Sequence, residues 1–145
     1  MEIALAADHA GFELMQSLVA YLREKGHELL ELGTFSDQPI DYPDKANELI
    51  QAIKSGQAEL GILVCGSGIG MSIAANRQPG IRAALAPSLE HALLGRAHNN
   101  ANVLCLGGRL TPLELALRIT DAFLATPFEG GRHQGRVEKL DTQCP

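Results

Sequence analysis

Short apolar runs alternate with segments of helical periodicity along the chain, and this alternation constrains the fold more than any other feature. The run Leu60–Cys65 is apolar nearly throughout, as expected of a strand that is buried on both faces of a sheet. Comparable runs occupy residues 2–7, 27–32, 81–86 and 103–106. Strands that alternate with helices pair in parallel. We therefore predict five parallel strands with helices on both faces of the sheet, in one domain that spans residues 1–145.

The intervening segments predict five helices and a short one in the tail. Apolar stripes of helical spacing cover residues 12–25, 44–55 and 88–97, and a further helix follows the glycines at 66–70. The segment Thr111-Pro112-Leu113-Glu114 predicts a helix to about Ala125, with Thr111 as the N-cap. The polar remainder, residues 128–145, is expected to hold one short helix. No role is indicated for its end, including Cys144.

Composition excludes several classes of protein. The formal net charge is -5, which argues against a general nucleic-acid binder. No apolar run approaches the ~20 residues that a membrane helix needs, and the start has no signal-peptide pattern, so we expect a soluble cytoplasmic protein. The three cysteines are widely spaced, so they predict neither a disulfide framework nor a zinc site.

Ligands of such sheets bind beyond the carboxyl ends of the strands, which draws attention to the segment Cys65-Gly66-Ser67-Gly68-Ile69-Gly70. Its glycines and the helix start after it can stabilise an anion, either a phosphate or an oxyanion. A tight turn that simply needs glycines is the alternative. Met71 stands where a dinucleotide motif would have its third glycine. Cys65 itself is either a proton-abstracting base or a small core residue.

Three further polar groups stand out. Asp8-His9 follows the first strand, where Asp8 either works with an imidazole or caps the next helix. His98-Asn99-Asn100-Ala101-Asn102 is either functional or a set of turn formers. Arg132-His133-Gln134-Gly135-Arg136 either holds a phosphate or is a solvated basic turn, and Arg109 is a further candidate for the phosphate. No set of His, Cys, Asp and Glu has metal-ligand spacing, so we expect no metal.

Taken in order, these segments resemble the ribose-5-phosphate isomerase B and galactose-6-phosphate isomerase family. The resemblance covers almost the whole chain and its joint pattern is specific. The segments that carry it are Ala6–Gly11, Asp41-Tyr42-Pro43, Cys65–Asn76, Gly80–Ala83, His98–Val103 and Gly130–Val137.

The resemblance implies a Rossmann-like three-layer αβα sandwich that forms a homodimer or a tetramer, with active sites built from two subunits. Cys65 would be the base, Ser67 would help to move protons, and Gly66, Gly68, Ile69 and Gly70 would form the anion hole. His98 and Asp8 would open the sugar ring, and Asn99 and Tyr42 would position the sugar. The phosphate would be held by His9, Arg109, Arg132, His133 and Arg136, the last four from the partner chain.

The resemblance further implies a metal-independent, cofactor-free isomerase of ribose 5-phosphate. One branch of the family uses a Glu base where this chain has Met71, so the chain is expected to be of the Cys type. Two alternatives stay open: an isomerase of a six-carbon sugar phosphate, such as galactose 6-phosphate or allose 6-phosphate, and a sugar-phosphate-binding module without catalysis.

Overall fold

A computed structural model describes residues 2–142 of the chain, so Cys144 lies outside the described residues. One parallel sheet has the strand order β2-β1-β3-β5-β4, which confirms the predicted five-stranded parallel sheet. This order places the apolar run Leu60–Cys65, which forms β3, at the centre of the sheet, where both of its faces are covered. The strands are β1 (Glu2–Ala7), β2 (Glu28–Glu31), β3 (Leu60–Cys65), β4 (Ala83–Leu85) and β5 (Val103–Gly107).

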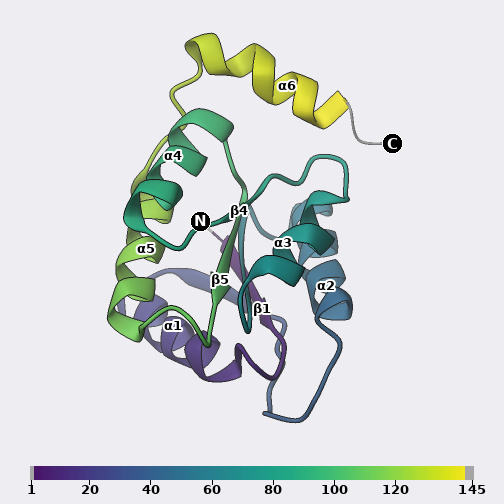
Figure 1. The fold of residues 1–145 in the computed structure, drawn as a ribbon, viewed down its shortest axis with the longest axis vertical. Coiled ribbons are helices and arrows are strands. Elements are labelled where there is room, and N and C mark those ends of the chain that lie inside the picture. The colour runs from purple at the N-terminus through teal and green to yellow at the C-terminus, as the bar shows by residue number, and fades with distance from the viewer. Residues whose placement is uncertain (1, 143–145) are drawn as a thin grey trace.

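Helices cover both faces of the sheet and make a three-layer sandwich (Figure 1). One apolar core lies between the sheet and α1, α4 and α5, and the other lies between the sheet and α2 and α3. Because the side chains of a strand alternate, β3 feeds both cores, with Ile62 and Val64 on one face and Leu63 and Cys65 on the other. The helices are α1 (Phe12–Glu24), α2 (Tyr42–Lys54), α3 (Ile69–Asn76), α4 (Leu89–Asn99), α5 (Leu113–Ala125), a short 3₁₀ helix η1 (Gly131–His133) and α6 (Gln134–Thr142).

Two predicted boundaries are wrong. Thr111 does not cap α5: it belongs to a turn after β5, where its N–H donates to the carbonyl of Gly107, and Pro112 is the N-cap, without a side-chain cap. β4 is shorter than the predicted strand over 81–86. The N–H of Arg82 donates to the side chain of Asn102, at 2.8 Å, instead of to a strand carbonyl.

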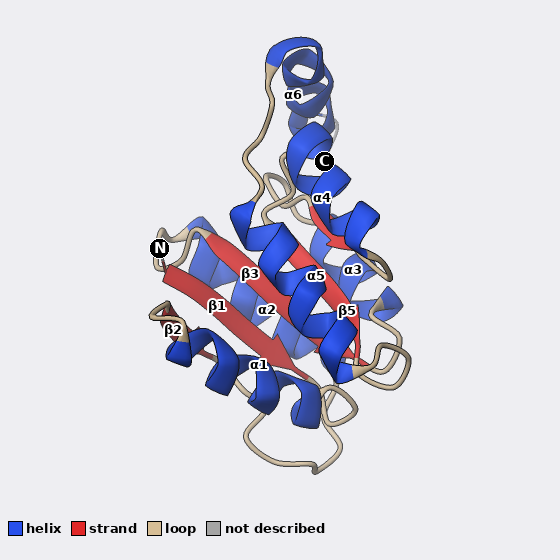
Figure 2. Ribbon diagram, turned by 90° about the vertical axis from the view of Figure 1, so that its left-hand side faces the viewer, coloured by secondary structure: helices blue, strands red, loops and turns tan. Residues whose placement is uncertain are grey.

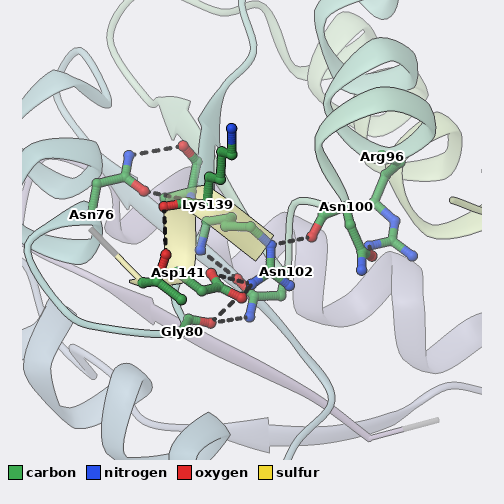
Figure 3. Close-up of polar contacts among 10 residues, drawn as sticks. Asn76, Gly80, Arg96, Asn100, Asn102, Lys139 and Asp141 are labelled. Carbon is green, nitrogen blue, oxygen red and sulfur yellow. Dashed lines mark hydrogen bonds and ion pairs between the residues drawn. The ribbon is translucent and has the colours of Figure 1, made fainter. Parts of the chain in front are cut away.

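The C-terminal helix α6 projects from the body of the molecule, away from the end at which β1 terminates (Figure 2). A guanidinium nitrogen of Arg82 donates to both carboxylate oxygens of Asp141, at 2.9 and 3.0 Å. The Nε of Arg82 donates to the carbonyl of Asn100, so one side chain joins α6 to the segment between α4 and β5 (Figure 3). Asp141, for which the sequence indicated no role, therefore anchors the helix that carries Arg136.

No helix within residues 2–142 combines the length and the apolar character that crossing a membrane requires.

The substitution Asp141→Ala should loosen α6 and leave the sheet intact. Loss of a partly exposed charge-assisted pair costs about 1 kcal/mol, so the amides of residues 134–142 should exchange hydrogen about five times faster. Hydrogen exchange with mass spectrometry measures this rate. Asp121→Ala is the control, because it removes an ion pair between α5 and Lys25 at the end of α1, which does not involve α6. Unchanged exchange of α6 in Asp141→Ala would show that other contacts hold the helix.

Candidate active site

The loops after the carboxyl ends of the strands enclose a cavity of about 610 Å³, where the parallel-sheet rule places a ligand. Loops that follow β1, β3 and β5 contribute to its wall, and α2 contributes from the side. Most of the residues that were expected to touch the sugar lie here. The wall consists of Asp8, Tyr42, Cys65, Gly66, Ser67, Ile69, Gly70, Ile73, Arg109 and Leu110.

The thiol of Cys65 faces the glycine loop from the end of β3. Its Sγ accepts a hydrogen bond from the N–H of Gly68, at 3.2 Å, and the side chain is 5% exposed. Gly68 has a φ of +82° and is the N-cap of α3, so the sulfur lies at the positive end of that helix. An amide donor and a helix N-terminus both stabilise negative charge on sulfur. The sequence left open whether Cys65 is a core residue, and the structure gives it both a core position and a place in the cavity wall.

Cys105 has a different environment, although it occupies the neighbouring strand on the same face of the sheet. Its side chain is completely buried in mid-strand. Burial raises the pKa of the Cys105 thiol, so this sulfur stays neutral. The prediction that Cys105 is a core residue is confirmed.

Ser67 and Tyr42 approach the glycine loop from different elements. The hydroxyl of Ser67 accepts a hydrogen bond from the N–H of Ile69, at 3.2 Å, at the start of α3. Tyr42 is the first residue of α2. Its ring packs so closely against the glycine loop that a Cβ atom on Gly70 would lie 2.6 Å from the ring. A half-exposed phenol and a hydroxyl thus flank the thiol, where they can contact a polyhydroxylated ligand.

Asp8 both stabilises a turn and faces the cavity. Its Oδ1 accepts hydrogen bonds from the N–H groups of Ala10 and Gly11, at 2.9 and 3.1 Å, in the turn before α1. Asp8 does not cap α1, whose N-cap is Gly11. The same side chain lines the cavity, so its role in the turn is compatible with a place at the site. His9 turns toward the loop before α2, where its Nδ1 accepts a hydrogen bond from the N–H of Ile40, at 3.2 Å.

Arg109 lies on the same side of the site as Cys65. Its backbone N–H donates to the carbonyl of Gly66, at 3.0 Å, and its side chain lines the cavity. The prediction that Arg109 comes from the partner chain is not supported, because its position after β5 brings it to the cavity that holds the cysteine of its own chain.

The remaining candidates line a second, separate cavity of about 440 Å³. They come from the C-terminal end of α4, from η1 and from α6. Because α4 ends directly before β5 begins, this cavity belongs to the amino edge of the sheet, opposite to Cys65. Its wall consists of His98, Asn99, Arg132, His133, Arg136, Val137 and Leu140.

Two imidazoles in the wall of the second cavity lie beside the exposed carboxylate of Glu129. The rings of His98 and His133 stack with centroids 4.2 Å apart and an angle of 14° between their planes. An oxygen of Glu129 lies 3.9 Å from the Nε2 of His98 and 3.8 Å from that of His133. The pKa of His133 is lowered, first by burial and then by the positive charges of His98, Arg132 and Arg136, whereas Glu129 acts in the opposite direction.

Sequence reasoning missed Glu129. The signal was present, because residues 129 and 133 have the spacing of one helical turn. The three side chains offer metal-ligand atoms within 4.8 Å of one another, which linear spacing did not reveal. However, the lone pairs of two nearly parallel stacked rings cannot point at one ion, so a metal would require the rings to turn.

The asparagines after His98 divide into two groups. Asn99 lines the second cavity. Asn100 ends α4 with a left-handed backbone, at φ 48°, and Asn102 donates to the carbonyl of Gly80, at 2.9 Å (Figure 3). The end of α4 therefore accounts for Asn100 and side-chain bonds to the segment before β4 account for Asn102, whereas His98 and Asn99 face a cavity.

Comparisons with known proteins agree with the fold and the motifs. A model of the family described as Ribose/Galactose Isomerase matches residues 3–140. The ribose-5-phosphate isomerase B of Escherichia coli is 47% identical over 96% of this chain and 93% of that protein. A ribose 5-phosphate isomerase structure from Thermotoga maritima superposes with a TM-score of 0.96 at 54% identity and covers 97% of each chain. Ribose-5-phosphate isomerase B of Clostridium thermocellum gives a TM-score of 0.96 at 43% identity, over 98% of this chain and 96% of that one.

The glycine loop generates a prediction about Gly68. An alanine there must adopt a positive φ, and its Cβ would lie 2.7 Å from Leu85 and 3.0 Å from the backbone of Leu106. We expect Gly68→Ala to lower the free energy of unfolding by about 2 kcal/mol, measured by urea denaturation. Gly66→Ala is the matched control, because its Cβ would meet Arg109 at an ordinary 3.5 Å. Equal stability of the two variants would contradict this account of the loop.

Proposed function

The chain belongs to the ribose/galactose isomerase family, and we propose that it interconverts ribose 5-phosphate and ribulose 5-phosphate through an enediolate, with Cys65 as the base. One observation carries the assignment of the base: the Cys65 sulfur lines the larger cavity and accepts a hydrogen bond from a loop amide. The family resemblance places a Glu base at residue 71 in one branch, and the buried Met71 of this chain cannot accept a proton, which supports the Cys type of the family.

The reaction moves a proton between two neighbouring carbons. Cys65 removes the proton from the carbon next to the carbonyl and returns it to the former carbonyl carbon, with the enediolate as the intermediate. Amides of the loop Gly66–Gly70 and the N-terminus of α3 stabilise the negative oxygen as it forms. The hydroxyl of Ser67 lines the same cavity, where it can exchange a proton with a substrate oxygen. A proton shift of this kind needs no cofactor.

The second cavity suits the phosphate and the sugar ring. Arg132 and Arg136 are four residues apart and, with His133, offer the positive donors that a phosphate dianion prefers. Asn99 lies beside them, where its amide can bond to sugar hydroxyls. His98 would open the furanose ring together with Asp8, which lies in the first cavity. The phosphate itself does not react, and its binding energy orients the reacting carbons.

Separation of these groups supports a homodimer with shared active sites. Cys65 and His98 lie at opposite edges of one sheet, so a single chain cannot bring both to one sugar. Two chains related by a two-fold axis can place the first cavity of one against the second cavity of the other. Apolar side chains are exposed where such contact would occur: Ile69, Ile73 and Leu110 at the first cavity and Leu140 at the second.

Other expectations stay predictions. Preference for a five-carbon substrate rests on the ribose-5-phosphate isomerases among the relatives, and kinetics with a six-carbon sugar phosphate would decide it. We keep His9, which adjoins Asp8, among the residues proposed to bind the phosphate. We further propose a single cytoplasmic domain without a nucleic-acid partner, whose dimers can pair into a tetramer.

Cys65→Ala should abolish isomerisation without unfolding the chain. Loss of a general base typically reduces kcat by 10²–10⁴-fold, so we expect a loss of about 10³-fold. Formation of ketose from ribose 5-phosphate, measured with a chelator present, gives the rate. Cys105→Ala is the control: it alters a buried cysteine outside the site and should retain kcat. Full turnover by Cys65→Ala would remove this thiol from the mechanism.

Mixed dimers test the shared site. Cys65→Ala and His98→Ala damage different cavities, so each variant alone should be inactive. If the chains are unfolded and refolded together, half of the dimers are mixed and each mixed dimer has one intact site. About a quarter of the wild-type activity should therefore return. Refolding each variant separately is the control. Absence of recovery, with mixed dimers verified by mass spectrometry, would mean that each site is built from one chain.

A further inference from the structure

Glu129 lies beside the imidazole pair of the second cavity, with its side chain 59% exposed, and the proposed reaction gives it no role. Its carboxylate oxygen is within 4.0 Å of both Nε2 atoms, at 3.9 Å from His98 and 3.8 Å from His133. Within residues 2–142, no other carboxylate lies that close to either ring. One acidic side chain therefore faces two imidazoles that come from different elements, α4 and η1.

The backbone fixes Glu129 in this position. Its N–H donates to the carbonyl of Ala97, at 3.0 Å, so residue 129 is tied to the residue before His98. Gly130 and Gly131 follow with φ values of 66° and 53°, and this turn brings His133 back against His98. Residues 129–133 therefore form a local turn that packs against the end of α4 and holds Glu129 beside both rings.

We propose that Glu129 is a positioning residue, whose carboxylate orients the imidazoles of His98 and His133 and stabilises one shared proton on this pair. This inference rests on the proposed function, in which His98 acts on the sugar ring and His133 holds the phosphate. Glu129 acts through the two imidazoles and need not touch the substrate.

Electrostatics of the cavity explain why a carboxylate is needed there. A positive charge on His98 opposes protonation of His133, and the guanidiniums of Arg132 and Arg136 oppose it as well. A single carboxylate can compensate one added proton. Without it, four positively charged or protonatable groups would face one another, and the pair would lose its proton at lower pH. A phosphate dianion would then meet a neutral imidazole, which is a weaker partner.

Glu129→Gln tests the charge, because glutamine keeps the shape of the side chain and removes the carboxylate. We expect kcat/KM for ribose 5-phosphate to fall about three- to tenfold, as when one charge-assisted contact is lost. The limb of the pH profile that titrates at roughly pH 5–8 should move to lower pH, since the protonated pair is less stable. Glu129→Asp keeps the charge on a shorter side chain and should restore part of the activity and the position of the limb.

Glu90→Gln is the matched control, because it removes one negative charge from the exposed first turn of α4, the helix that carries His98. This variant should retain the wild-type rate and pH profile. An equal shift in both variants would indicate a general charge effect and overturn the role of Glu129. So would a Glu129→Gln profile that coincides with that of the wild type, or a Glu129→Asp profile no closer to it than that of Glu129→Gln.

A titration that needs no turnover separates this inference from the proposed function. Proton NMR of the His133 ring in the folded protein should show its titration midpoint at lower pH in Glu129→Gln than in the wild type. A wild-type protein without isomerase activity would refute the proposed function, and the midpoint would still report on Glu129. An unchanged midpoint in an active enzyme would refute the positioning role alone.

Discussion

Gly11 lies so close to the end of β3 that a Cβ atom on it would be 2.4 Å from the carbonyl oxygen of Val64. The same carbonyl accepts the N–H of Asp8, at 3.1 Å, and Asp8 in turn holds the amide of Gly11. Close approach of these two segments keeps the loop after β1 against the central strand. As a result, the carboxylate of Asp8, directly after β1, and the thiol of Cys65 line one cavity. The proposed chemistry depends on the close approach of these two segments.

The sequence predicted the parallel sheet because five apolar runs alternate with helices, and Leu60–Cys65 has the pattern of a strand that is covered on both faces. Finer details depended on contacts between distant residues. Thr111 has the pattern of a cap, but it belongs to the turn after β5, where its N–H donates to the carbonyl of Gly107, and the helix begins after Pro112. The strand order was out of reach, since a helical connection of similar length can carry the chain to either neighbouring position in a sheet.

Each motif alone was a weak indication of the candidate site. Their order along the chain was a strong one, because it produced the resemblance to a family. Each motif admitted a structural explanation, and for Asp8 and Asn102 the structure supports that explanation, wholly or in part. The sequence did not indicate which candidates share a cavity. That division follows from the opposite directions of β3 and α4, which place Cys65 and His98 at different edges of the sheet. Glu129 was missed because its partners come from two elements.

Placing the two cavities at opposite edges of one sheet affects how such an enzyme can diverge after gene duplication. One copy can lose the thiol half and the other the arginine half, and a pair of unlike subunits would still keep one complete site. Each copy would then be freed from selection on the half it no longer uses, and that surface could adapt to a different sugar or a different regulator. The architecture would thus give the proposed homodimer a short route to an obligate hetero-oligomer.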